Sequence, residues 1–425
     1  MLDSCQAGDV RIPTSATLAV NDLVAARRAR GDTVLHLGFG EAGLPVLPQL
    51  REVLADAAAD NRYGPSAGSL SARAAAAGWF TRRGRATTAD QVILGPGSKP
   101  LLLAFVAALG GDVVLPQPAW VSYAAQAALL GREAIGVPVP DEAGGIPDPE
   151  LLEDAVRVAR SRGLRPAVLV LTVPDNPTGT FASADLLSRV CAVADHHGLA
   201  VICDEIYADL AFTGSSPSAA TYLPDRTVVT TGLSKSLAVG GWRIGFARLP
   251  DNAWGHALME RAVGIASETW SSLAAPMQQV MTYALGDPPE VTSFVDSARR
   301  LHARVATAVH ACLLEADARC RAPQAGFYLY PDFEPARERL ASRGIHSSAD
   351  LTHVLLDRHG IAALPGAAFG DDPAALRLRL ATSLMYGDTA QQRQAALAAD
   401  RPETLPWIAE ALDLIRTQLA ALVGR

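Results

Sequence analysis

The sequence is poor in cysteine and contains no long apolar run. It carries five cysteines in 425 residues, and none of them belongs to a Cys-x-x-Cys pair. The odd number argues against a disulfide framework, and the missing pairs argue against a zinc site, so we expect no bound metal. No apolar run reaches the ~18–20 residues that cross a bilayer, so we expect no membrane partner.

Charged residues are also scarce, at 19% of the chain, and the formal net charge is -7. Lysine and arginine are scattered, without the basic tract that a nucleic-acid groove requires. The first residues, MLDSCQAGDVRIP, lack the basic and then apolar order of a signal peptide. These features predict a globular protein of the cytoplasm and argue against nucleic acid as a partner.

Short apolar runs alternate with helical stretches in the first two thirds of the chain. Most runs are continuous and rich in β-branched residues, as in strands that are buried on both faces. We expect strands at Val34–Leu37, Gln91–Leu94, Asp112–Leu115, Ala167–Leu171, Ala200–Cys203, Thr227–Thr230 and Ile244–Ala247. We expect helices at Leu70–Arg82, Pro100–Ala108, Val121–Leu130, Pro149–Arg162 and Ala182–His197. This order predicts an α/β fold with a mainly parallel, seven-stranded sheet sandwiched by helices.

A smaller α+β unit is expected after about residue 290. A long helical segment, Val291–Glu315, leads there to an aromatic, strand-like run, GFYLY (Gly326–Tyr330). Further elements are expected near Ser348–His359, Leu376–Ala381 and Leu405–Leu422. We therefore expect a large domain over residues 48–289 and a small domain over residues 290–425. The N-terminal segment, residues 1–47, is expected to join the small domain.

The most informative segment is Thr231–Gly245, with the sequence TGLSKSLAVGGWRIG. Lys235 stands in a turn of glycine and serine directly after an apolar strand, and Arg243 follows eight residues later. A lysine that forms a Schiff base needs close backbone approach to its cofactor, which the glycines and Ser234 allow. Arg243 offers a planar fork that suits a phosphate group. The whole pattern favours a cofactor site over a surface lysine in a loop.

This segment resembles the Schiff-base signature of fold-type I enzymes that depend on pyridoxal 5′-phosphate (PLP), in the class I/II aminotransferase (aspartate aminotransferase-like) family. The resemblance runs from about residue 34 to residue 383. It implies PLP-dependent transferase fold type I and an internal aldimine on Lys235, which also serves as the general base. Asp204 in DEIY would pair with the pyridine nitrogen, and Tyr207 would reach the 3-oxygen. A carboxylate is needed there because the protonated ring is the electron sink.

Other motifs resemble the remaining cofactor contacts of that family. The turn GPGSK matches the phosphate cup, assigned to Gly97, Ser98 and Lys99 at a helix N-terminus. Lys99 is a rival for the Schiff base, but it lacks an arginine at the right spacing. Trp120 matches the aromatic residue that stacks on the pyridine face, with an ordinary core aromatic as the alternative. Asn176, in NPTG, would contact the 3-oxygen.

The strand LRLRLATS resembles the family strand whose arginine clamps the α-carboxylate of the substrate. Alignment on Ala-Thr-Ser selects Arg377 for this role. Arg379 points to the same face of the strand and stays an alternative. Gly40, in GFGEAG, matches the family glycine beside the carboxylate. Together with Trp120 and Asn176, these residues form the expected substrate-binding set.

The sequence departs from the family where substrate choice resides. The family's GEPDF is GEAGL here, and Trp270 replaces a small polar residue, so that it is expected either to line a partner's site or to pack. No second arginine for a dicarboxylate is evident. Tyr123, Tyr330 and Trp270 would suit an apolar or unusual substrate, but the sequence does not identify its side chain.

The leading hypothesis is an aminotransferase that moves an amino group between an amino acid and a 2-oxo acid through pyridoxamine phosphate. Tyr63, in NRYG, matches a family tyrosine that donates to the neighbouring subunit's phosphate, which implies a homodimer with shared active sites. The runner-up keeps PLP but performs γ-elimination or replacement, ring formation or oxidation, since all start from the same carbanion. A ligand-sensing domain of a transcription regulator is a minor alternative, because no helix-turn-helix pattern is present.

Overall fold

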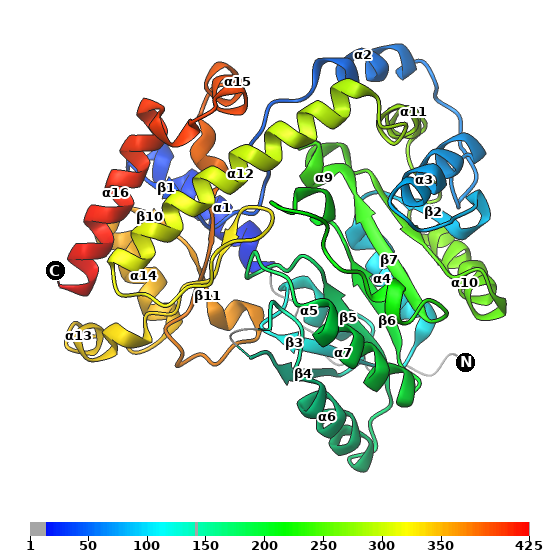
Figure 1. Cartoon of the computed structure of the whole chain (residues 1–425), viewed down its shortest axis with the longest axis horizontal. Coiled ribbons are helices and arrows are strands. Elements are labelled where there is room, and N and C mark those ends of the chain that lie inside the picture. Colours follow the sequence, from blue (N-terminus) through cyan, green and yellow to red (C-terminus); the bar gives the residue numbers. More distant parts are fainter. Residues whose placement is uncertain (1–13, 141–142, 425) are drawn as a thin grey trace, which may run out of the picture.

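A computed structural model of the chain describes residues 14–140 and 143–424. Figure 1 shows one half that holds the principal sheet and another half in which elements from both ends of the chain lie together. Cys5 and the stretch on which the expectation of no signal peptide rests lie outside the described residues.

The principal sheet has seven strands in the order β2-β8-β7-β6-β5-β3-β4. They are β2 (Val92–Gly95), β3 (Asp112–Gln117), β4 (Ala134–Pro138), β5 (Pro166–Thr172), β6 (Ala200–Asp204), β7 (Thr227–Gly232) and β8 (Gly245–Arg248). Neighbouring strands are parallel except at β8, which is antiparallel to β2 and β7. Every residue of β2, β6 and β7 is buried, which explains the apolar and β-branched runs in these strands.

The predicted number of sheet strands is confirmed, but one member differs. The sequence pattern does not predict β4, because this edge strand is partly exposed and contains Gly136 and Pro138, which weaken a strand signal. The predicted strand Val34–Leu37 forms β1 (Leu35–His36), which pairs with β10 (Ile361–Ala362) outside the principal sheet.

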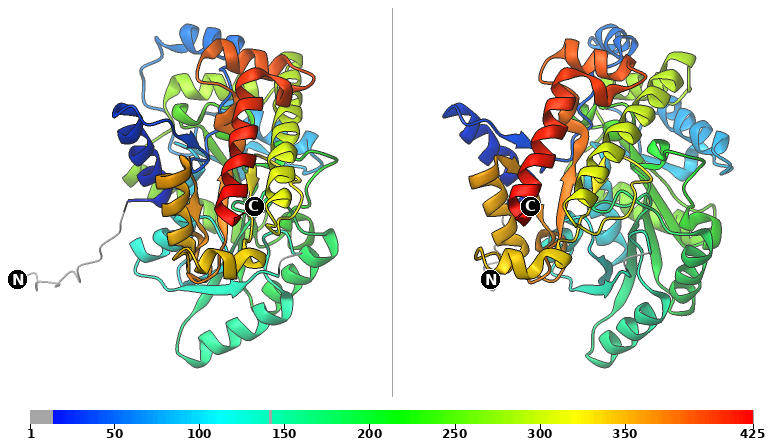
Figure 2. Two further views of the ribbon diagram at one scale, coloured as in Figure 1. Left: turned by 90° about the vertical axis from the view of Figure 1, so that its left-hand side faces the viewer. Right: turned by 60° about the vertical axis from the view of Figure 1, so that its left-hand side comes forward.

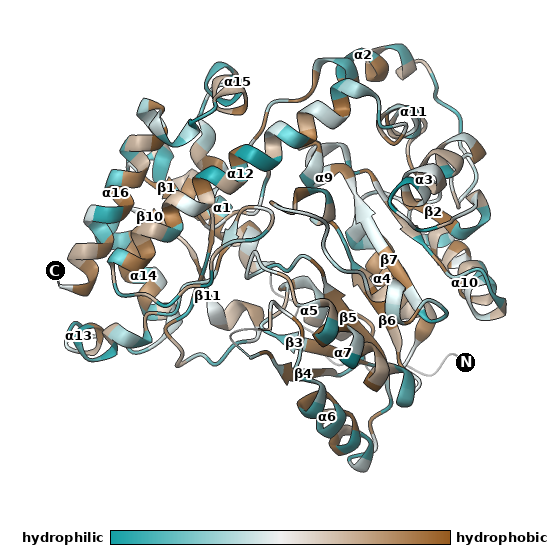
Figure 3. Ribbon diagram, viewed as in Figure 1, coloured by the Kyte–Doolittle hydropathy of each residue, from teal (hydrophilic) through white to brown (hydrophobic). Residues whose placement is uncertain are grey.

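Helices cover both faces of the principal sheet, as Figure 1 shows. They are α3 (Leu70–Arg82), α4 (Ser98–Leu109), α5 (Ser122–Leu129), α6 (Pro149–Ser161), α7 (Ala184–His196), α8 (Ala219–Tyr222), α10 (Ala253–Thr269) and α11 (Ala275–Ala284). On one face, Val168 and Val170 pack in a cluster with residues of α4 and α10. On the other face, Leu169 and Leu171 pack with residues of α6 and α7. Alternate residues of β5 thus point to opposite layers, and Figure 3 shows hydrophobic colour concentrated on these strands.

The other half is built around the 27-residue helix α12 (Pro289–Glu315) and a three-stranded sheet of order β11-β12-β9. Its further elements are α1 (Ala16–Ala29), β9 (Tyr328–Leu329), α13 (Arg337–Ala341), α14 (Ser348–His359), β11 (Leu364–Pro365), β12 (Leu378–Ala381), α15 (Ala390–Ala398) and α16 (Pro406–Val423). Figures 1 and 2 show α16 lying beside α12.

Helix α2 (Pro48–Ala57) packs on α11 and α1 contacts β11, so the chain crosses between the halves along residues 38–47. The domain boundaries at residues 48 and 289 stay predictions. Among residues 14–140 and 143–424, no helix combines the length and apolar character needed to cross a membrane.

Candidate active site

A cavity of about 550 Å³ lies where the parallel strands of the principal sheet end. The segments that follow β2, β3, β6 and β7 line it, together with the crossing segment before α2 and two strands of the other half. Ten predicted site residues line this cavity: Gly40, Ser98, Lys99, Trp120, Asn176, Asp204, Tyr207, Ser234, Lys235 and Arg243. The fold thus collects residues that are widely separated in the sequence.

Lys235 lies just after β7, on the short helix α9 (Leu233–Ser236). Its Nζ donates a hydrogen bond to the backbone oxygen of Gly40 and lies 5.9 Å from the ring centroids of Tyr207 and Phe327. Behind it, Gly232 has no room for a side chain, because a Cβ would lie 2.5 Å from the backbone oxygen of Ile244. Close backbone packing therefore holds the strand end from which the amine projects into the cavity.

Lys99 and Lys235 are the two lysines of the sequence, and all other residues in its basic count of 37 are arginines. Both lysines line this cavity. The Nζ of Lys99 lies 5.0 Å from the ring centroid of Trp120, and burial, with Arg243 and Lys235 nearby, lowers the pKa of Lys99. A Schiff base on a lysine side chain of this protein must form inside the cavity.

One end of the cavity suits an anion. Helix α4 begins there at Ser98, so its N-terminal amides and the positive end of its dipole lie beside the cavity. Gly97, which does not itself line the cavity, caps this helix, and a Cβ on Gly97 would lie 2.2 Å from Nη2 of Arg243. Arg243 has a φ of 58°, a left-handed value that is uncommon for a non-glycine residue. These groups together fit a phosphate.

Asp204 ends β6 and is buried against the cavity. Its Oδ2 accepts a hydrogen bond from the hydroxyl of Tyr123 at 3.0 Å, and that hydroxyl also lies 2.7 Å from Oγ1 of Thr172. Burial raises the pKa of the Asp204 carboxyl to about 6, while the hydrogen bond from Tyr123 lowers it. The buried Oδ1 has no hydrogen-bond partner within the described part of the chain. A buried acceptor is costly without a donor, so this oxygen fits a protonated ring nitrogen.

The two arginines near β12 have different surroundings. Arg379 is 1% exposed, lines the cavity, and donates to the backbone oxygen of Gly38 and, at 3.4 Å, to Oδ1 of Asn176. Its guanidinium lies 4.8 Å from the ring centroid of Tyr328 and 5.2 Å from that of Phe369. Burial lowers the pKa of Arg379, and none of the ion pairs found among the described residues includes it.

Arg377 lies outside this cavity. It forms ion pairs with Asp332 at 3.2 Å and Asp371 at 3.1 Å, and it lines a separate cavity of about 450 Å³. Arg377, the residue predicted to bind the substrate, therefore lies outside the cavity that holds Lys235, whereas Arg379, the alternative, lines it; which of the two binds substrate stays a prediction. Sequence spacing cannot distinguish the two arginines, because both point to one face of the strand. They differ in burial and in their acidic neighbours, which only the structure shows.

Two further predicted residues do not line the cavity. Tyr63 is 94% exposed, so it can contribute to a cofactor site only in a second copy of the chain. Trp270 packs against the cluster between the principal sheet and helices α4 and α10, which agrees with its packing alternative.

Several lining residues carry no recognisable motif. Thr17 and Leu18 come from α1, Phe39 and Glu41 from the crossing segment, and Tyr328 from β9. Helix α1 and the crossing segment reach the cavity because the two halves pack together. Sequence patterns do not show this packing. The aromatic run GFYLY marks β9 as a strand, but it does not reveal that Tyr328 meets Tyr207.

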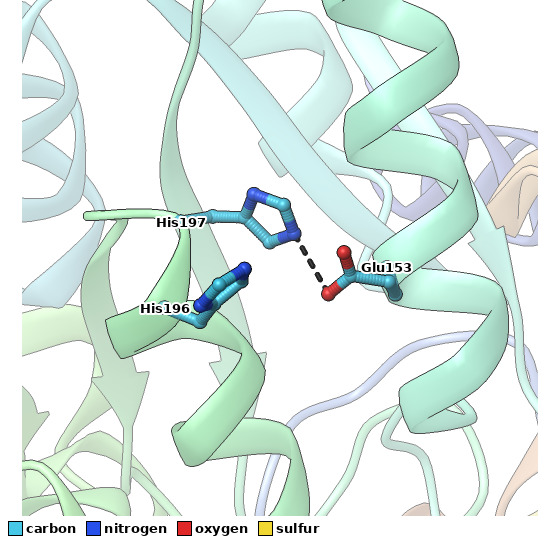
Figure 4. A group of neighbouring side chains, drawn as sticks. All are labelled: Glu153, His196 and His197. Atoms are coloured by element: carbon cyan, nitrogen blue, oxygen red, sulfur yellow. Dashed lines mark ion pairs between the residues drawn. The ribbon is translucent and has the colours of Figure 1, made fainter.

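Figure 4 shows Glu153, His196 and His197, three neighbouring side chains whose ligand atoms lie close enough together to bind a metal ion. Nε2 of His197 lies 2.8 Å from Oε2 of Glu153, and its Nδ1 lies 3.0 Å from Nη1 of Arg160. A guanidinium only donates, so Nδ1 accepts and Nε2 carries the proton, although Nε2 has no hydrogen-bond partner among the described residues. A metal at Nε2 would have to displace this proton beside the charge of Arg160. These contacts are therefore explained as a link between α6 and α7.

Comparisons with known proteins agree with this geometry. The chain matches the family model of aminotransferase class I and II over residues 32–392. It is 30% identical over 396 residues to an aspartate aminotransferase of Geobacillus stearothermophilus, which covers 89% of this chain and 95% of the relative. It is 29% identical over 378 residues to an aspartate/prephenate aminotransferase of Thermus thermophilus, with 87% and 92% covered. The solved aspartate aminotransferase of Thermus thermophilus with maleate matches with a TM-score of 0.76 and 26% identity, over 91% of this chain and 96% of that one.

This chain belongs to the class I and II aminotransferases. It is accordingly a PLP-dependent aminotransferase of fold type I, so the predicted fold class, cofactor and enzyme class are confirmed. The cavity fits PLP, since the Lys235 amine, the end of α4 with Arg243, and the unpartnered Oδ1 of Asp204 match its aldehyde, phosphate and pyridine nitrogen. When bound, PLP supplies a ring that withdraws electrons from the substrate Cα.

Proposed function

We propose that amino transfer in this chain uses Arg379 to bind the α-carboxylate of the amino acid and Lys235 to move the proton of its Cα. The observation that carries the proposal is a buried guanidinium that has no acidic partner among the described residues, in the cavity that also holds the Lys235 amine. A buried cation without a counterion is costly, and a substrate carboxylate would relieve that cost through a charge-assisted hydrogen bond. Asn176, whose Oδ1 accepts from Arg379, orients the guanidinium.

The other cavity residues have separate tasks in this proposal. Asp204 holds the proton of the pyridine nitrogen, because its Oδ1 has no partner within the described residues. Tyr207 and Asn176 bind the 3-oxygen, Trp120 stacks on the ring, and Arg243 binds the phosphate together with the end of α4. With PLP bound, Lys235 would act as the general base that moves the proton of the substrate Cα.

The half-reaction tests this function directly. A stoichiometric amino acid, added without a 2-oxo acid, should convert the visible spectrum of bound PLP to that of pyridoxamine phosphate, and a 2-oxo acid should then restore it. Initial rates with both substrates should give the parallel lines of ping-pong kinetics. A cofactor spectrum that never converts would instead favour γ-elimination, ring formation or oxidation as the native reaction.

We further propose that the substrate side chain carries no negative charge. The cations that line the cavity are Lys99, Lys235, Arg243 and Arg379. The first three lie near one another at the cofactor end, and Arg379 is assigned to the α-carboxylate, so residues 14–140 and 143–424 leave no cation in this cavity for a second carboxylate. Glu41, with Leu18 and Phe39, lines the remaining wall and would repel one.

A substrate panel checks this inference. Leucine, phenylalanine and tyrosine should shift the visible cofactor band at lower concentrations than aspartate or glutamate. Aspartate, the amino acid in the names of the relatives, would contradict the inference if it were the best substrate, and it would then point to a cation from a second subunit.

We also propose a homodimer with shared active sites, in the cytoplasm. The exposed Tyr63 supports the dimer, because its side chain has no role in the cavity of its own chain. The four cysteines of the described residues are free thiols, three of them buried, which agrees with a reducing compartment. Light scattering of the PLP-loaded protein measures the assembly, and fractionation of the source cells measures the compartment.

A further inference from the structure

We propose that Tyr328 is a positioning residue, whose hydroxyl controls how strongly Tyr207 donates to the 3-oxygen of the cofactor. The inference rests on the proposed function, in which Tyr207 binds that oxygen. Its basis is a hydrogen bond of 2.8 Å between the two hydroxyl oxygens, at side chains that are 2% and 3% exposed. Both residues line the cavity, so this bond lies where the cofactor binds.

The Tyr328 ring is fixed from several sides. It meets the ring of Tyr207 edge to face, with centroids 5.4 Å apart, and lies 4.7 Å from the ring of Phe327. The guanidinium of Arg379 lies 4.8 Å from its centroid. A Cβ on Gly40 would lie 2.2 Å from the Tyr328 hydroxyl oxygen, so the crossing segment closes the remaining side. The hydroxyl therefore stays within reach of Tyr207.

The direction of the hydrogen bond between Tyr207 and Tyr328 follows from the single proton that each hydroxyl carries. Each hydroxyl has one proton, so if Tyr207 donates its own to the 3-oxygen, Tyr328 must donate to Tyr207. A chain of this kind is cooperative, because a hydroxyl that accepts a hydrogen bond becomes a better donor. The cation over the Tyr328 ring withdraws electron density from it and strengthens its hydroxyl as a donor.

The effect can be read from the pH dependence of the visible cofactor band. This band reports the proton on the nitrogen that joins Lys235 to the cofactor. A donor at the 3-oxygen stabilises the negative charge there, so it favours loss of that proton and lowers the midpoint pH. The charged or titratable groups that face Tyr207 are Tyr328, Arg379, Asp204 and Lys235.

The experiment compares four PLP-loaded variants by spectral pH titration: Tyr328→Phe, Tyr207→Phe, the double variant, and Tyr386→Phe as a control. Tyr328→Phe should raise the midpoint by about half a pH unit, because one neutral hydrogen bond is weakened. Tyr207→Phe should raise it further, and the double variant should equal Tyr207→Phe. Tyr386 is also buried, and its hydroxyl lies 2.6 Å from Nδ1 of His302, but it does not line the cavity, so its variant should keep the wild-type midpoint.

A second substitution covers the case in which Tyr328→Phe does not fold. Placing 3-fluorotyrosine at position 328 keeps the ring and makes the hydroxyl more acidic, so the midpoint should fall below the wild-type value. An unchanged midpoint in either Tyr328 variant, or shifts that add in the double variant, would overturn the inference. A wild-type protein without a visible cofactor band would contradict the proposed function itself.

Discussion

Arg377 and Arg379 stand two positions apart on one strand face, yet only Arg379 lines the cavity that holds Lys235. The guanidinium of Arg377 already contacts Asp332 and Asp371, whereas that of Arg379 is enclosed by aromatic rings and backbone oxygens. A carboxylate that enters the cavity therefore gains most from Arg379, because no acid of the described residues competes for it.

We expect Arg379→Ala to raise KM for the amino acid on the order of 30- to 1000-fold. The loss of a partner from a buried, charge-assisted pair costs about 2–4 kcal/mol, and each 1.4 kcal/mol corresponds to tenfold. Arg377→Ala is the matched control. It removes two partly exposed ion pairs, so it should lower Tm by a few degrees and change KM less than threefold. The opposite ranking in steady-state kinetics would return the role to Arg377.

We expect Lys235→Ala to abolish the visible cofactor band and the turnover. Borohydride reduction followed by mass spectrometry should place the cofactor on the peptide that contains Lys235. Lys99→Arg keeps the positive charge and should retain the label at Lys235. Label at Lys99 in the wild-type protein, or a visible band in Lys235→Ala, would refute the assignment.

Motifs that resemble those of the class I and II aminotransferases predicted residues that the structure brings together in one cavity, while their roles there stay predictions. Asp204 ends strand β6, and Asn176 and Lys235 follow shortly after the ends of β5 and β7, so the fold carries them to one place once the strands pair. The substrate side depends on which of two equivalent arginines is buried and on Tyr328 meeting Tyr207. These contacts arise between elements far apart in the chain, and no local pattern encodes them.

The turn after β5 contains a second buried carboxyl at Asp175. Oδ2 of Asp175 accepts hydrogen bonds from Oγ1 of Thr178 at 2.7 Å and from its backbone N–H at 3.1 Å. Burial nevertheless raises the pKa of Asp175 to about 7. The folded protein thus holds a proton here that the unfolded chain releases near its ordinary pKa, so the free energy of unfolding falls as the pH rises from about 4 to about 7.

We expect Asp175→Asn to flatten this pH dependence, since the amide mimics the protonated carboxyl. Between pH 4 and pH 8, the free energy of unfolding of the wild-type protein should fall by on the order of a few kcal/mol more than that of the variant. Thermal unfolding of the PLP-saturated proteins measures it. Asp154→Asn, at an exposed position of α6, should keep the wild-type slope. Equal slopes in all three proteins would show that Asp175 is charged at neutral pH.

At the level of elements, prediction succeeds where a strand or helix is defined by its own pattern. Helix α3 agrees with its predicted bounds, because a capping serine, Ser69, precedes it and apolar residues recur on one side. Strand β4 has no such pattern, since its place comes from pairing with β3. The two-residue strand β1 joins the other half for the same reason, through its partner β10.

At the scale of the whole molecule, the exposed Tyr63 predicts that two chains complete each other's sites. We expect Tyr63→Phe to weaken PLP binding in the homodimer by removing a hydrogen bond to the phosphate. Mixed dimers of Tyr63→Phe with Lys235→Ala should regain one site with wild-type PLP affinity, because that site combines Lys235 of one chain with Tyr63 of the other. Mixed dimers that bind PLP no better than Tyr63→Phe alone would rule out sharing.

Both lysines of the sequence lie in one cavity, so reagents that react with primary amines find few target side chains on this protein. A reagent that acylates primary amines can modify Lys99, Lys235 and the terminal α-amino group, while the arginine-rich exterior stays inert to it. PLP should shield the two cavity amines from such a reagent. Coupling of the loaded protein to an amine-reactive surface would then leave the two lysines of the catalytic cavity unmodified.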